Sequence, residues 1–124
     1  MSDRRAQTGQ AAEAVVARRF EEAGFVVEAR NWRCKGGELD VVAARGELLV
    51  FVEVRSVTTD FLDSPTLTVS AAKQGRVARA ADLYLRRRAV APRDIRFDVV
   101  GVVFGAHGTR VEHLVDAFTS PWAF

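Results

Sequence analysis

Two acidic residues, Asp40 and Glu53, lie in segments that otherwise resemble buried β-strands. Apolar residues follow Asp40, and Glu53 comes directly after the apolar run of residues 48–52. A carboxylate in such surroundings loses hydration unless a cation compensates its charge. A divalent cation held between the two carboxylates would remove their repulsion, and ligation by oxygen alone favours Mg²⁺ or Mn²⁺. The two residues are therefore candidate metal ligands.

The Gly46-Glu47 pair, which separates the two apolar segments, determines whether these carboxylates can meet. Glycine suits the first central position of a type II′ hairpin turn. If Gly46 and Glu47 are the two loop residues, Asp40 lies opposite Glu53 with Cβ atoms roughly 5 Å apart. A three-residue loop would direct the two carboxylates to opposite faces of the sheet. The predicted metal site therefore depends on this turn.

The elements that must position these residues follow from hydrophobic periodicity and turn residues. The expected helices cover residues 8–23 and 70–88, with Ser70 as the N-cap of the second. The hairpin of residues 37–55 supplies two strands, and three more are expected at residues 25–30, 96–104 and 109–115. Residues 31–37 and 56–69 are expected to be loops. This order predicts an α/β domain of residues 1–124 with a mixed sheet flanked by helices.

Length and composition agree with a globular protein. The chain has 124 residues, of which 48% are hydrophobic and 27% charged, as in ordinary globular domains. No apolar run approaches the ~20 residues that a membrane span needs, and the N-terminus lacks the apolar stretch of a signal peptide. The single cysteine, Cys34, excludes an internal disulfide. A cytoplasmic location is therefore expected.

Basic residues are numerous but nearly balanced by acids, since the net charge is only +2. The 18 basic residues are 16 arginines and 2 lysines. Arginine binds phosphate through two parallel hydrogen bonds, although a GC-rich genome would also enrich arginine. On the second expected helix, an arc of roughly 100° contains Arg76, Arg79, Arg86 and Arg87, with Lys73 at its border. This arc is either a solvated basic face or a phosphate-binding stripe, with Lys73 reaching toward the carboxylates.

Five ordered motifs extend over nearly the whole chain. They are Gly9-x-x-Ala12-Glu13, Asn31-x-Arg33-x-x-x-Gly37-Glu38-Leu39-Asp40, Phe51-Val52-Glu53-Val54-Arg55, Lys73 and Arg96-Phe97-Asp98-Val99-Val100. Together they resemble the YraN-like family of small uncharacterised bacterial proteins (UPF0102 type), which looks like a branch of the PD-(D/E)XK nuclease superfamily. The resemblance implies a restriction-endonuclease-like αβββαβ core and Mg²⁺- or Mn²⁺-dependent hydrolysis of DNA, in branched or damaged structures.

The resemblance also implies which residues are catalytic. They are Glu13, Asp40, Glu53, Arg55 and Lys73. Phosphodiester hydrolysis needs a cation that polarises the phosphoryl oxygen and helps to deprotonate a bound water. Asp40, Glu53 and the Val54 carbonyl would ligate this cation, and Glu13 would ligate it through water or orient the nucleophile.

Arg55 stands where the superfamily motif ends in lysine. A guanidinium cannot act as a base in a protein, so Arg55 would either stabilise negative charge or pair with Glu38, which the two-residue turn places opposite it. Lys73 would then supply the missing amine. The alternative is a nucleic-acid-binding module on the same fold whose catalysis has lapsed.

The remaining candidates have simpler interpretations. Arg33 and Lys35, in the expected glycine-rich loop, are predicted to bind nucleic-acid phosphates. Asp98 is either structural or supports the basic network. His107 and His113 are not expected to be catalytic, because neither is near a serine, cysteine or second histidine at a suitable spacing.

The C-terminal aromatic residues leave two alternatives open. Phe118, Trp122 and Phe124 either close the core or form the contact of a homodimer. A two-fold dimer would place two sites on opposite strands of a DNA junction.

Overall fold

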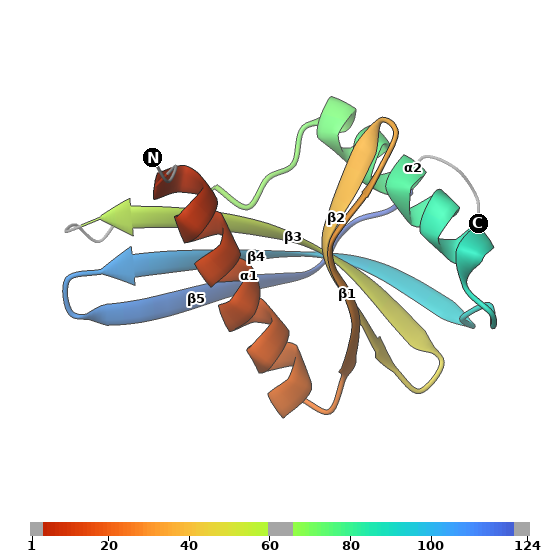
Figure 1. The fold of residues 1–124 in the computed structure, drawn as a ribbon, viewed down its shortest axis with the longest axis horizontal. Coiled ribbons are helices and arrows are strands. Elements are labelled where there is room, and N and C mark those ends of the chain that lie inside the picture. Colours follow the sequence, from red (N-terminus) through yellow and green to blue (C-terminus); the bar gives the residue numbers. More distant parts are fainter. Residues whose placement is uncertain (1–3, 60–65, 121–124) are drawn as a thin grey trace.

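Five strands form one mixed sheet in the order β1-β2-β3-β4-β5, in which β3 and β4 are parallel and the other neighbours antiparallel (Figure 1). The computed structural model describes residues 4–59 and 66–120. Along the chain the elements are α1 (Arg4–Glu22), β1 (Val26–Cys34), β2 (Gly37–Arg45), β3 (Leu48–Thr59), α2 (Ala71–Arg87), β4 (Asp94–Gly105) and β5 (Gly108–Phe118). The predicted α/β order of helix, three strands, helix and two strands is therefore confirmed.

The turn between β2 and β3 is the one that the sequence predicts. Gly46 has a φ of +60°, whereas the φ of Glu47 is negative, as a type II′ turn requires. Val41 pairs with Val52, which is the register that a two-residue loop dictates. The β2–β3 ladder ends at this pair.

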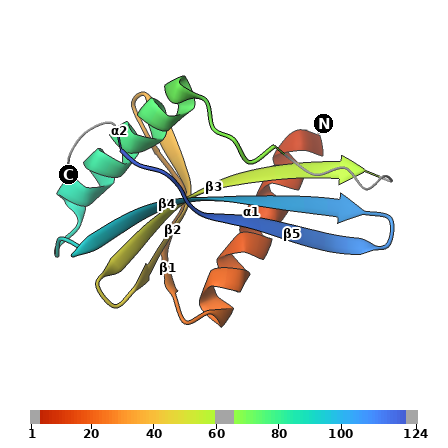
Figure 2. The ribbon, with the colours of Figure 1, turned by 180° about the vertical axis from the view of Figure 1, so that it is seen from behind.

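The two helices cover opposite faces of the sheet (Figures 1 and 2). Helix α1 buries Ala12, Val16 and Phe20, which recur at helical spacing, against one face. Helix α2 buries Val77 and Ala81 against the other face. Each face of the sheet therefore has its own hydrophobic core.

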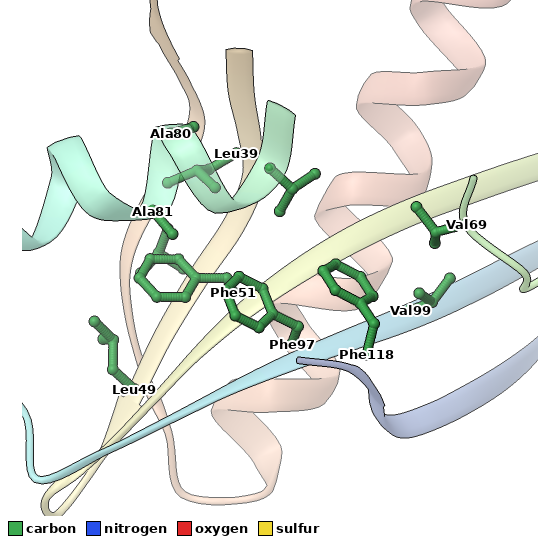
Figure 3. Packing of buried hydrophobic residues seen from close by; sticks show 11 residues of the cluster. Leu39, Leu49, Phe51, Val69, Ala80, Ala81, Phe97, Val99 and Phe118 are labelled. Carbon is green, nitrogen blue, oxygen red and sulfur yellow. The ribbon is translucent and has the colours of Figure 1, made fainter. Parts of the chain in front are cut away.

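Stacked aromatic rings fill the core beneath α2 (Figure 3). The Phe97 ring lies between those of Phe51 and Phe118, with ring centroids 5.5 Å and 4.9 Å away. Phe118 therefore closes this core, as one of the two alternatives predicted. Trp122 and Phe124 lie outside the described residues.

Two segments expected to be loops are partly strand. β1 continues through Asn31 to Cys34, which leaves Lys35 and Gly36 as the turn. β1 is an edge strand whose residues alternate between partly buried and exposed, and such polar alternation resembles a loop in a sequence. Likewise, β3 continues to Thr59, because its parallel ladder with β4 extends to the pair Thr59–Gly105.

Helix α2 begins where the sequence predicts. The Ser70 side-chain oxygen accepts a hydrogen bond from the Lys73 backbone N–H at 3.2 Å, which is an N-cap contact. The helix ends at Arg87, with Arg88 as its C-cap. Within the described part of the chain, neither helix combines the length and apolar character needed to cross a membrane.

Candidate active site

Asp40 lies where β2 separates from β3. The predicted backbone pairing does not extend to Asp40 and Glu53, because the ladder stops one pair earlier, at Val41 and Val52. Instead, the Asp40 side chain reaches β3: its Oδ2 accepts a hydrogen bond from the Val54 N–H at 2.8 Å. Asp40 and Glu53 are nearly buried, with 8% and 7% of their surfaces exposed.

Glu53 is close enough to Asp40 to affect the ionisation of the Asp40 carboxyl. Burial, followed by repulsion from Glu53, raises the pKa of the Asp40 carboxyl from 3.8 to about 7. The hydrogen bond from Val54 opposes this shift, whereas Glu13 and Glu38 add smaller repulsions. An acid with this pKa is only partly ionised at neutral pH. An additional positive charge close to Asp40 would therefore favour its ionised form.

Two cationic side chains approach Glu53. Lys73 Nζ, from the first turn of α2, lies 3.5 Å from Glu53 Oε1, and Arg55 Nε lies 3.7 Å from the same oxygen. Lys73 therefore reaches one of the two carboxylates, as one of the two alternatives for this helix face expected. Arg55 Nε is buried and has no hydrogen-bond partner among the described residues. We refer to Asp40, Glu53, Arg55 and Lys73 as the acidic site.

Glu13 approaches the acidic site from α1. It is half-buried, and burial is the main cause that raises the pKa of its carboxyl. Nearby Arg30 and Arg33 oppose that shift, while Glu38 reinforces it. Its repulsion of Asp40 places Glu13 within electrostatic range of the site.

Glu38 does not pair with Arg55, contrary to the sequence prediction. Its Oε2 lies 3.3 Å from Arg33 Nε. Glu38 is the partner of Arg33 in the β1–β2 ladder, in the part of β2 that does not pair with β3. Arg33 is thus a strand residue rather than a loop residue. The turn that follows it lies close to α2, since a Cβ on Gly37 would be 2.6 Å from the Arg76 carbonyl oxygen.

A pocket of about 360 Å³ adjoins the acidic site between the β1–β2 turn and α2. It is lined by Arg33, Cys34, Gly36, Gly37, Glu38, Lys73, Arg76 and Val77, and we call it the basic pocket. Arg79 extends over its edge, because a Cβ on Gly36 would lie 3.2 Å from Arg79 Nη1. Lys35 is exposed at the same turn. These residues include the four predicted nucleic-acid-binding residues.

The other two arginines of the predicted stripe lie further along α2. Arg86 Nη2 lies 3.2 Å from Asp82 Oδ2, and the Arg87 guanidinium lies over the Trp32 ring, 5.5 Å from its centroid. All four arginines are exposed. Arg76 and Arg79 therefore lie beside the basic pocket, whereas Arg86 and Arg87 contact other side chains further along α2.

The donor set of the acidic site is limited to two carboxylates. Among the described residues, no group of three or more His, Cys, Asp or Glu side chains could hold a metal ion. Asp40 and Glu53 nevertheless fit a hard divalent cation, because both offer oxygen ligands and because burial and repulsion from Glu53 raise the pKa of the Asp40 carboxyl. The predicted Val54 carbonyl would add a third oxygen.

A second charged cluster was not foreseen from the sequence. Asp98 is fully buried; its Oδ1 accepts hydrogen bonds from Arg96 Nε at 2.8 Å and Asp116 N at 3.0 Å. Its Oδ2 accepts from Arg96 Nη2 and from His113 Nε2, both at 2.8 Å. We call these residues the Asp98 network. The spacing Arg96-x-Asp98, which puts both side chains on one face of a strand, was the available signal.

These features define the class of protein: a small α/β protein with a buried carboxylate pair and an adjacent lysine. A family model described as "Uncharacterised protein family UPF0102" matches residues 12–102. The UPF0102 protein of Myxococcus xanthus (strain DK1622) is 44% identical over 92% of this chain and 90% of its own length. Those of Anaeromyxobacter dehalogenans (strain 2CP-C) and Syntrophus aciditrophicus (strain SB) are 43% and 38% identical, over 94% and 90% of this chain and 87% and 88% of their own lengths. The chain belongs to the UPF0102 family, as its YraN-like motifs predicted.

Proposed function

We propose that this protein is a metal-dependent nuclease-like enzyme that hydrolyses phosphodiesters in DNA. The observation that carries the proposal is the meeting of Asp40, Glu53 and Lys73, with Lys73 Nζ 3.5 Å from a Glu53 oxygen. The resemblance to PD-(D/E)XK nucleases implies the same residue types on the same elements. The element order from α1 to β4 supports the αβββαβ core that this superfamily has.

Asp40, Glu53 and the Val54 carbonyl are the proposed ligands of Mg²⁺ or Mn²⁺. Such a cation would polarise the phosphoryl oxygen and lower the pKa of a bound water. The two carboxylates are nearly buried, so their charge is poorly hydrated in the absence of a partner. A divalent cation would favour the ionised form of Asp40, which burial and Glu53 disfavour.

The other residues of the site act directly on the phosphate and the nucleophile. Lys73 and Arg55 stabilise the negative charge that develops on the phosphoryl oxygens. The buried Nε of Arg55 offers a donor that the described residues do not satisfy. Glu13 orients the attacking water from the α1 side.

The basic pocket gives the proposed substrate contacts. Arg33, Lys35, Arg76 and Arg79 bind backbone phosphates on both sides of the cleaved bond, and such contacts do not depend on base sequence. A substrate recognised through its shape, such as branched or damaged DNA, suits this kind of contact. A homodimer would present two such sites to a junction.

Arg55 favours a second candidate function, a nucleic-acid-binding module whose catalysis has lapsed. The motif lysine is replaced by a guanidinium that cannot exchange a proton. In that case binding to DNA weakens steeply with salt, is unaffected by a chelator, and leads to no hydrolysis.

The metal site is tested by calorimetric titration of Mn²⁺ into the protein and two variants. Asp40→Asn removes a ligand while keeping the shape of the side chain, and we expect it to abolish binding. Asp82→Asn, whose carboxylate pairs with Arg86 further along α2, is the matched control and should bind as the parent does. Equal binding by all three proteins, or none by the parent, would contradict the metal site.

Hydrolysis is tested with labelled duplex, flap, junction and single-stranded DNA in the presence of Mn²⁺. We expect the parent and Asp82→Asn to cleave a branched substrate, and Asp40→Asn to lose at least about 100-fold in rate. Salt-sensitive binding without cleavage of any substrate would select the second candidate. Absence of both binding and cleavage would reject both functions.

A further inference from the structure

A second pocket lies on the opposite face of the sheet from α2, beneath the C-terminal half of α1. Its volume is about 350 Å³, within the range of small-molecule sites. It is lined by Val16, Arg19, Phe20, Glu22, Ala23, Phe25, Arg96, Val100 and His113. We call it the α1 pocket. It shares no residue with the basic pocket.

The Asp98 network fixes the direction of two groups that line the α1 pocket. Asp98 binds Arg96 through Nε and Nη2, so this edge of the guanidinium is occupied, and the end that carries Nη1 is not used by Asp98. Asp98 also binds His113 through Nε2, which leaves Nδ1 on the far side of the ring. The Phe20 ring contacts His113, with centroids 5.5 Å apart. The positions of Arg96 and His113 are therefore set before any ligand binds.

The charges and shapes of the lining residues select the class of ligand. Arg19 from α1 brings a positive charge to the pocket, Glu22 brings a negative one, and Arg96 from β4 brings a guanidinium that is paired with Asp98. Because one edge of Arg96 is already bound to Asp98, its remaining donors and those of Arg19 reach the pocket from two different elements, β4 and α1. Donors from different directions match a tetrahedral oxyanion better than a flat carboxylate. The Phe20 and Phe25 side chains form an apolar wall beside them.

We propose that the α1 pocket binds a phosphate monoester, with Arg19, Arg96 and His113 holding the phosphate group and the Phe20–Phe25 wall contacting the apolar part of the ligand. This site is independent of the proposed nuclease function. The fully buried Asp98 acts as a positioning residue for Arg96 and His113 rather than as a ligand.

Inorganic phosphate is the first probe, titrated by nuclear magnetic resonance against chloride at constant ionic strength. We expect amide shifts near Arg19 and His113, and about tenfold weaker binding in Arg19→Gln, which removes one charge-assisted contact from an exposed helix position. Arg86→Gln, whose guanidinium lies on α2, should bind as the parent does. A nucleoside monophosphate should bind more tightly than phosphate, because it adds contacts with the apolar wall.

Sulfate, titrated at a single pH, tests the role of His113. His113 lines the pocket and contacts Asp98, so His113→Ala, which removes the ring, should bind sulfate about tenfold more weakly. His113→Gln retains a side-chain donor and should recover part of this binding.

Three outcomes would overturn the assignment. The first is phosphate binding that Arg19→Gln leaves unchanged but Arg76→Gln removes, which would place the anion in the basic pocket. The second is an absence of measurable binding by the parent at millimolar phosphate. The third is sulfate binding that His113→Ala leaves unchanged. None of these outcomes depends on Mn²⁺ binding, so failure here is separate from failure of the nuclease proposal.

Discussion

Asp40 on β2 and Asp98 on β4 are both buried aspartates of one sheet, yet their surroundings shift the pKa of their carboxyls in opposite directions. Asp98 accepts four hydrogen bonds, two of them from Arg96. Burial would raise the pKa of its carboxyl, but His113, Arg96 and the Asp116 amide together lower it. Asp40 accepts one hydrogen bond, from Val54, and burial and Glu53 raise its pKa to about 7.

This difference distinguishes a carboxylate whose charge is compensated within the chain from one whose charge lacks such compensation. The charge of Asp98 is neutralised within the chain, so its contribution is to hold β4 and β5 together and to position its donors. The charge of Asp40 is disfavoured by burial and by Glu53, and the two nearby cations, Lys73 and Arg55, both approach Glu53 instead. Burial alone does not distinguish the two residues; the number of donors does.

The comparison is tested most strongly by Asp98→Ala. Removing the carboxylate leaves the Arg96 fork and the His113 ring without their acceptor, and breaking a buried pair in this way costs about 3–5 kcal/mol. Urea unfolding at pH 7 measures the change. Asp94→Ala, at the exposed start of β4, is the control and should stay within about 0.5 kcal/mol of the parent. A loss below about 1 kcal/mol for Asp98→Ala would mean that the network does not stabilise the fold.

Asp40→Asn should increase the free energy of unfolding rather than lower it, and the size of this increase should depend on pH. Because the pKa of Asp40 is about 7 in the folded state and 3.8 in the unfolded reference, its contribution to stability is complete below pH 4 and is lost as pH rises through 7. The side-chain amide that replaces the carboxyl in Asp40→Asn does not titrate. With a chelator present, the variant should therefore gain stability relative to the parent between pH 4 and pH 8, by on the order of 2–4 kcal/mol.

Urea unfolding at pH 4.5 and pH 8 checks this change, with Asp82→Asn as the matched control. Addition of Mn²⁺ at pH 8 should stabilise the parent and leave Asp40→Asn unaffected, since only a ligand that binds the folded state shifts the equilibrium. Parallel pH profiles of the parent and Asp40→Asn would mean that Asp40 is not held in an unfavourable charged state.

The sequence predicted the parts of the fold and site that depend on local chemistry. The Gly46-Glu47 turn determined the β2–β3 register, and Ser70 determined the start of α2, because each acts within a few residues. One of the two alternatives for the basic face of α2 had Lys73 reaching toward the carboxylates. The contact of Lys73 with Glu53 agrees with this alternative.

The errors concern contacts that depend on how strands bend. Glu38 pairs with Arg33 rather than Arg55, because residues 37–40 of β2 do not pair with β3. Nothing local in the sequence marks this separation of the two strands. The contact of His113 with Asp98 depends on a bulge, where the β4–β5 register shifts between Phe97 and Val99. Such long-range shifts are set by the packing of the whole sheet rather than by the residues at the contact.

The smallest expected effect on stability, and the most specific, is that of Lys73→Met. The lysine lies 3.5 Å from Glu53 with 28% of its side chain exposed, so its removal should cost about 1 kcal/mol or less at pH 5. At pH 8, without metal, the cost should increase, because Asp40 is then ionised and a nearby cation offsets more repulsion. Lys73→Arg keeps the charge and should follow the parent at both pH values in urea unfolding. A cost for Lys73→Met that is the same at pH 5 and pH 8 would show that Lys73 does not respond to the charge of Asp40. The lysine would then be a neighbour of Glu53 alone, and the acidic site would consist of two separate halves.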